Sequence, residues 1–126
     1  MALKHRIGKS QTIPFRITSE TATQVVVIFS GEVSKVVYQR FSYPQRGDSN
    51  DIQDSSTELE WKLLDYEESS VGNIFTGVLD EEATQDIEDD ILVMDIKGWD
   101  DSGNTRVKRC RLLPIVDTQV QEINAI

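Results

Sequence analysis

The residue types needed for covalent catalysis are scarce in this chain. The only histidine, His5, lies in a basic N-terminal segment outside any predicted element, so a Ser–His–acid or Cys–His arrangement would depend on an unanchored imidazole. The single cysteine, Cys110, stands between Arg109 and Arg111, which would make its thiol reactive if all three shared an exposed face. Alternate side chains of a strand point to opposite faces, so we expect Cys110 to be inert and half-buried.

Carboxylates are the other candidates for chemistry, and most lie between residues 80 and 101. Their spacing does not match the alternating ligands of an EF-hand loop, and residues 100–104 have the composition of a hairpin turn. Our main interpretation is a solvated acidic loop, with a cation site or a carboxylate-only enzyme as less favoured alternatives. No metal, cofactor or phosphate-binding glycine loop is expected. The acidic residues before the predicted strand at 91–99 are Asp80, Glu81, Glu82, Asp86, Glu88, Asp89 and Asp90.

Aromatic residues suggest a binding function, because sugar rings stack on exposed aromatic faces. Trp99 precedes a predicted turn, and together with Tyr43 and the polar segment 42–56 it could form a glycan platform. Trp61 alternates with charged neighbours, so we expect it at the centre of the core. The tripeptide Arg46-Gly47-Asp48 is interpreted as a chance match to an adhesion motif.

Basic residues are concentrated in two short segments, one near each end of the chain, while the rest of the charge is mainly acidic. Such segregation could set the register between neighbouring copies of the chain. The competing interpretation is that opposite charges meet within one molecule on solvated faces. The basic residues are Lys4, Arg6 and Lys9 in the first segment and Arg106, Lys108, Arg109 and Arg111 in the second.

Length and composition are those of one soluble globular domain. The 126 residues are 38% hydrophobic and 28% charged, and no apolar run approaches the roughly 20 residues that a membrane-spanning helix needs. The formal net charge of -9 disfavours nucleic acid and anionic lipid as main partners.

Period-two alternation between turn residues predicts most of the secondary structure. Residues 12–17 form a first strand, which Pro14 places at a sheet edge or leaves paired on one side only. Residues 24–29 form a central strand that makes a hairpin with 33–41, and 42–56 form a long exposed loop. Strands follow at 58–63 and at 74–79, where Gly77 could mark a bulge.

The remaining pattern predicts one helical turn within 80–90, a central strand at 91–99 and a hairpin with 105–115. Residues 116–126 show no clear pattern and could dock on a neighbour. The fold class is therefore all-β, an immunoglobulin-like antiparallel sandwich of about seven strands with at most one short helix. We expect a single domain over residues 1–126, with terminal arms at 1–9 and 116–126.

The order of these elements resembles the N-terminal sandwich domain of the upper baseplate proteins of siphophages. The matching features are a basic lead, Ile13-Pro14-Phe15-Arg16-Ile17, Phe75-Thr76-Gly77-Val78-Leu79, the connector 80–90, Leu92-Val93-Met94-Asp95-Ile96 and a final hairpin through Gly103. The resemblance implies a non-enzymatic virion protein, assembled in the host cytoplasm as a homo-oligomer with other particle proteins. A carbohydrate-binding or adhesion module is the alternative.

Overall fold

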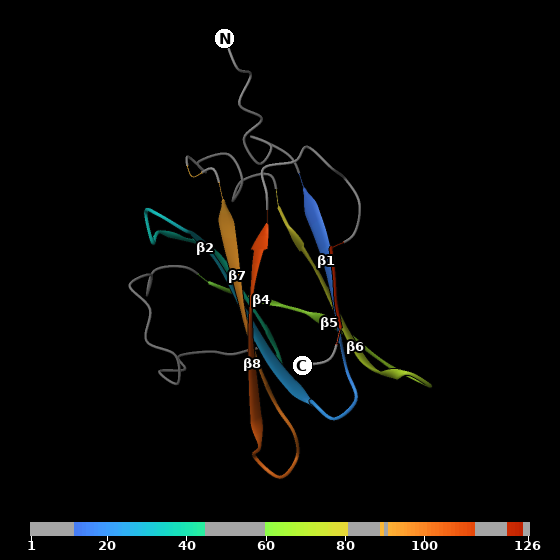
Figure 1. Ribbon diagram of the computed structural model, residues 1–126. Helices are drawn as coiled ribbons and strands as arrows, with labels where there is room; N and C mark the ends of the chain where they lie inside the picture. Colours follow the sequence, from blue (N-terminus) through green and yellow to red (C-terminus); the bar gives the residue numbers. More distant parts are fainter. Residues whose placement is uncertain (1–11, 45–59, 81–88, 90, 113–120, 125–126) are drawn as a thin grey trace.

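The computed structural model describes residues 12–44, 60–80, 89, 91–112 and 121–124, which form two β-sheets that pack against each other (Figure 1). One sheet has the strand order β5-β6-β1-β9, made of β1 (Ile13–Ser19), β5 (Asp65–Ser69), β6 (Gly72–Leu79) and β9 (Gln121–Asn124). The other has the order β4-β3-β2-β7-β8, made of β2 (Gln24–Gly31), β3 (Val37–Tyr43), β4 (Trp61–Leu63), β7 (Leu92–Trp99) and β8 (Thr105–Leu112). The predicted all-β sandwich is confirmed.

The strand count and two of the pairings differ from the prediction. The described residues form nine strands rather than about seven, because β5 follows β4 at once and residues 121–124 form β9. This part of the predicted C-terminal arm pairs with β1 of its own chain. The pairings β1 with β9 and β3 with β4 are parallel. No helix occurs among the described residues, and most of the connector 80–90 lies outside them.

The first strand is not an edge strand. β1 lies between β6 and β9, so the prediction from Pro14 was wrong about its place in the sheet. The physical constraint is nevertheless met, because β9 pairs with β1 only from Phe15 to Thr18. Pro14 is opposite Val78 of β6 alone, and its missing N–H interrupts no second ladder.

The main core is built from phenylalanines of both sheets rather than around Trp61. The ring of Phe15 on β1 meets Phe29 on β2 edge-on at 5.2 Å and Phe41 on β3 at 5.0 Å. Trp61 instead packs with Val26 and Ile28 in a smaller cluster on the outer face of the five-stranded sheet. Its prediction as the core centre was wrong, because the register of β4 turns its side chain outward.

The predicted hairpins are confirmed, and the predicted bulge is not where it was expected. β2 pairs with β3 and β7 with β8, both antiparallel, and β2 and β7 lie inside their sheet. The register of β6 with β1 runs through Gly77 without a shift. Gly77 is instead needed for space, since a Cβ there would come within 2.6 Å of the Phe15 ring. The register shift in this fold lies between β2 and β3, where Phe29 is opposite Gln39 and Ser30 is opposite Val37.

The shortest of the crossings between the two sheets takes a single residue. Leu64 separates β4, at the edge of one sheet, from β5, at the edge of the other, and its side chain is fully buried in the main core. Tyr43 of β3 stacks on Tyr66 of β5 at 4.7 Å, which aligns the two sheets on this side. The sandwich therefore has one flank formed by β4 and β5 and an opposite flank that ends in β8.

Candidate functional site

The predicted basic strand is β8, and its cations divide between the two faces of the sheet. Cys110 and Leu112 pack against the main core, so Arg106 and Lys108 share their face of the strand. Arg109 and Arg111 project from the outer face. This alternation confirms that Cys110 is half-buried and turned away from its two arginine neighbours.

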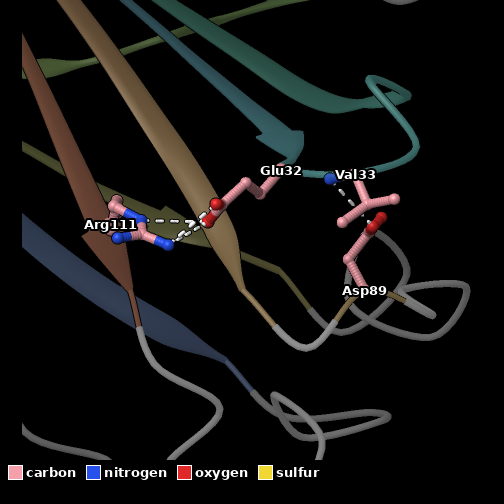
Figure 2. A network of polar contacts seen from close by, with 4 residues as sticks. All are labelled: Glu32, Val33, Asp89 and Arg111. Atoms are coloured by element: carbon pink, nitrogen blue, oxygen red, sulfur yellow. Dashed lines mark hydrogen bonds and ion pairs between the residues drawn. The ribbon is translucent and has the colours of Figure 1, made fainter.

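Both outer-face arginines have acidic partners within the chain. Arg111 donates from Nε and Nη2 to both oxygens of Glu32 at 2.7–2.9 Å (Figure 2). Arg109 donates from Nε to Asp95 at 2.7 Å, and this hydrogen bond raises the pKa of its guanidinium. The interpretation of charges meeting within one molecule therefore holds for these two residues. The other basic segment, with Lys4, Arg6 and Lys9, lies outside the described residues.

The opposite flank carries acidic residues. β5 contains Asp65, Glu67 and Glu68, all exposed, and no cation. Its inner-face residue Tyr66 is half-buried and donates a hydrogen bond to Glu68 at 3.2 Å. Burial first, and then this hydrogen bond to a carboxylate, raises the pKa of Tyr66. This acidic edge was not singled out from the sequence, although the run of acidic residues was visible there.

The glycan platform does not assemble as predicted. Tyr43 is opposite Val25 and Trp99 is opposite Gln24, so the two rings leave opposite faces of the five-stranded sheet. Tyr43 packs against the rim of the main core, where its ring stacks on Tyr66. Trp99 is half-buried, with the Lys97 ammonium 5.0 Å from the centre of its ring. Residues 45–56 of the predicted loop lie outside the described part of the chain.

Trp99 does line a cleft of about 310 Å³ at one end of the sandwich. The cleft lies between the β1–β2 turn, with Thr21 and Ala22, and the β7–β8 hairpin, with Thr105 and Arg106. Asp100 shapes the hairpin by accepting hydrogen bonds from the backbone N–H groups of Ser102 and Asn104, both at 2.9 Å. Its pKa is lowered, chiefly by the Asn104 side chain.

The acidic stretch contains one buried structural carboxylate. Asp89 accepts hydrogen bonds from the Ser34 hydroxyl at 2.5 Å, the Ser34 N–H at 3.0 Å and the Tyr38 hydroxyl at 3.0 Å. A further bond comes from the N–H of Val33 (Figure 2). The Ser34 hydroxyl is the main reason that the pKa of Asp89 is lowered, against the opposing effect of burial. The interpretation as a solvated loop was therefore wrong for Asp89.

Asp80, at the start of the same stretch, is also held by neighbours. Its carboxylate accepts a hydrogen bond from Gln39 at 2.9 Å and pairs with the Lys62 ammonium at 2.5 Å. The residues between these two aspartates, and Asp90, are not described. Within the described ranges, no three His, Cys, Asp or Glu side chains lie together as a metal site would require.

Comparisons with known proteins assign this chain to no family, so it is classified by its fold alone. The chain matches no protein-family model, and no significant match was found among curated proteins or solved structures. None of the described segments forms a helix with the length and hydrophobicity to cross a membrane.

Proposed function

We propose that this chain is a non-enzymatic structural module of a phage-like particle and acts through contacts with its own copies and with other particle proteins. The observation that carries the proposal is the opposite charge of the side chains on two edge strands, β8 and β5. One flank ends in β8, whose four ionisable side chains other than the thiol are all cations. The other includes β5, whose charged side chains are all carboxylates.

The exposure of β8 supports a role in subunit contact. Residues 105–109 and Arg111 are exposed, and Val107 keeps 71% of its surface accessible. An edge strand of eight residues offers unpaired backbone groups to any strand that approaches it. Charged side chains along such an edge restrict pairing to partners of complementary charge.

The use of the carboxylates supports contact rather than catalysis. Asp89 holds a hairpin, and Asp95 pairs with a strand neighbour. Asp100 orders a turn. Each of these groups accepts hydrogen bonds from donors of its own chain, which stabilises the folded state and leaves it poorly placed for proton transfer to a substrate.

Quantitative mass spectrometry of purified particles from the source of the chain tests this proposal. We expect the chain at a fixed, integral copy number relative to the major particle proteins, retained after washing in high salt. Recovery only at trace, variable amounts would refute a structural role in the particle.

A second candidate function, glycan binding, is favoured by the cleft that contains Trp99. Trp99, Arg106, Thr21 and Thr105 line one concave surface, and aromatic, cationic and hydroxyl residues are the types that carbohydrate sites use. Glycan-array binding that Trp99→Ala and Arg106→Ala each abolish would favour this function. Lys35→Ala, at an exposed turn away from the cleft, is the matched control. Absence of binding to any glycan would remove the candidate.

A further inference from the structure

We infer that the free edge of β8 binds an extended, acidic segment of a different particle protein, which joins the five-stranded sheet as an antiparallel strand. This inference rests on the proposed function of assembly through subunit contacts, and it names the edge, the chemistry of the partner and the residues that select it. The carboxylates of the added segment lie beside Arg106 and Lys108.

The backbone groups of β8 that point to the free edge belong to every second residue. In an antiparallel ladder, two opposite residues either exchange hydrogen bonds or both point away from each other. The carbonyl oxygen of Trp99 accepts a hydrogen bond from the N–H of Thr23, on the β2 side, so the backbone of its partner Thr105 points away from β7. The later residues of β8 in the same phase as Thr105 are Val107, Arg109 and Arg111. No described strand lies beyond β8 to bond with these groups.

The other phase of β8 places two cations on the inner face of the sheet. Arg106 and Lys108 share this face with Cys110, which packs against the main core. Both cations are nevertheless exposed, and β8 is the fifth strand of its sheet while the facing sheet has four. Arg106 forms no ion pair with a carboxylate of the described residues. An added strand therefore meets positive charge on its inner face.

Antiparallel addition brings acidic side chains close to these two cations. The backbones of Arg106 and Lys108 face β7, so each residue meets the added strand in a non-hydrogen-bonded pair, where opposite side chains are closest. Opposite charges in such a pair stabilise a sheet, and like charges destabilise it. On the outer face both arginines of β8 already have carboxylate partners, so charge selection falls on the inner positions.

The described edges of a second copy do not fit this position. A second β8 would set cations opposite cations. β5 is acidic, and Ser69 and Gly72 face each other across its two-residue turn. The free backbone groups of β5 therefore belong to Tyr66 and Glu68, so antiparallel pairing would put the inner face of β5 beside the outer face of β8. β4 and β9 are only three and four residues long.

The partner segment has a definite side-chain pattern. Carboxylates occupy two positions that are separated by one residue, opposite Lys108 and Arg106. Val107 keeps 71% of its surface accessible and favours an apolar side chain between them. Cys110 and Leu112, both half-buried, favour apolar side chains at the next two inner positions. The peptide Val-Thr-Val-Thr-Glu-Val-Glu-Thr, aligned antiparallel with β8, has this pattern.

Amide hydrogen exchange of the full chain, followed by NMR with and without this peptide, tests the docking edge. The N–H groups that point to the free edge should exchange fast in the free protein and become protected when the peptide binds. The N–H groups of the intervening residues bond to β7 and should exchange slowly in both states. Protection without this alternation, or protection confined to another surface, would overturn β8 as the docking edge.

Peptide titrations monitored by NMR measure the charge preference. A matched peptide with lysine in place of both glutamates should bind at least about tenfold more weakly. A variant that combines Arg106→Glu and Lys108→Glu should reverse the preference, since both inner positions change sign. Lys35→Glu, an exposed charge reversal in the β2–β3 turn, is the control and should leave the preference unchanged. Equal binding of the two peptides by the wild-type protein would refute an acidic partner.

The outcomes separate this inference from the proposed function. Protection of the same N–H groups in the protein alone, increasing with its concentration, would mean that a second copy occupies the edge and would overturn the assignment to a different chain. The particle mass spectrometry described above judges the structural role independently, because a protein held in the particle through another surface would still give a fixed copy number.

Discussion

The Asp89 carboxylate lies so close to the backbone of Gly31 that no side chain fits at position 31. A Cβ there would overlap both the carboxylate and the Ser34 hydroxyl that donates to it. Gly31 ends β2, and its carbonyl oxygen accepts a hydrogen bond from the Lys35 N–H at 3.1 Å. The close packing of Asp89 on Gly31, together with its hydrogen bonds to Ser34, thus holds the β2–β3 turn against the segment before β7.

Gly31→Ala should destabilise the fold by displacing Asp89. We expect a loss of about 2 kcal/mol, within the range for overpacking a filled site. Urea unfolding followed by tryptophan fluorescence measures it. Gly103→Ala is a useful comparison, because open space surrounds Gly103 and only its φ of 84° resists a side chain. A neutral Gly31→Ala would contradict the close contact.

Asp89 should make stability depend on pH in the acidic range. Its pKa is lowered by folding, so its contribution is present above the unfolded-state value of about 3.9 and is lost as pH falls through the folded value. Asp89→Ala should cost about 2–4 kcal/mol at pH 7, since several donors lose a charged acceptor. The difference between wild type and variant should shrink toward pH 3. A difference that stays constant with pH would refute the linkage.

Gly77→Ala should disturb the main core rather than the strand pairing. The added methyl would press on the Phe15 ring at 2.6 Å and on Leu64 at 2.9 Å, and both side chains are fully buried. We expect a loss of about 1–3 kcal/mol. Pairing the substitution with Phe15→Leu should recover part of it, which a thermal-unfolding series would show.

The Glu32–Arg111 pair should contribute little to stability despite its bidentate geometry. The side chains retain 34% and 59% of their accessible surface, so water screens the charges. A double-mutant cycle with alanine should give a coupling of about 0.5–1 kcal/mol that falls with added salt. The single-contact pair Arg16–Glu122 is the matched comparison and should couple more weakly. Equal coupling in both pairs would contradict the role of geometry.

The two aromatic clusters should differ in energetic weight. Phe29 has no accessible surface and joins Phe15 and Phe41, so Phe29→Ala should cost about 3–5 kcal/mol. Trp61 packs on the outer face under the Arg40 guanidinium, 4.5 Å from its ring centre. Trp61→Ala should cost at least about 1 kcal/mol less. A larger loss of stability for Trp61→Ala than for Phe29→Ala would support Trp61 as the centre of the core.

Alternation in the sequence predicted the central strands because their burial is set locally. β2 contains an unbroken apolar run at 25–29, β7 begins with one at 92–94, and their hairpins have recognisable turns. The alternation around Trp61 predicted the wrong face, because Leu63 is 54% exposed and the next residue, Leu64, enters the core. A change of sheet between β4 and β5 reverses the pattern and leaves no local signal.

The candidate site was predictable only in its composition. The charges of β8 and the aromatic character of Trp99 were visible in the sequence. Which cations share a face with Cys110, and that Tyr43 and Trp99 diverge, depend on the strand register. The role of Asp89 depends on Ser34, 55 residues earlier in the chain, and no spacing rule connects them.

The corner at Leu64 gives the sandwich a mechanical property. One peptide segment runs from the edge of one layer directly into the edge of the other, with its connecting side chain embedded between them. A pulling force on β5 is therefore transmitted to the other layer through a single residue, whereas on the opposite flank eight residues, 113–120, separate β8 from β9 of the other layer. Under tension, the layers should shear apart first on the side away from Leu64.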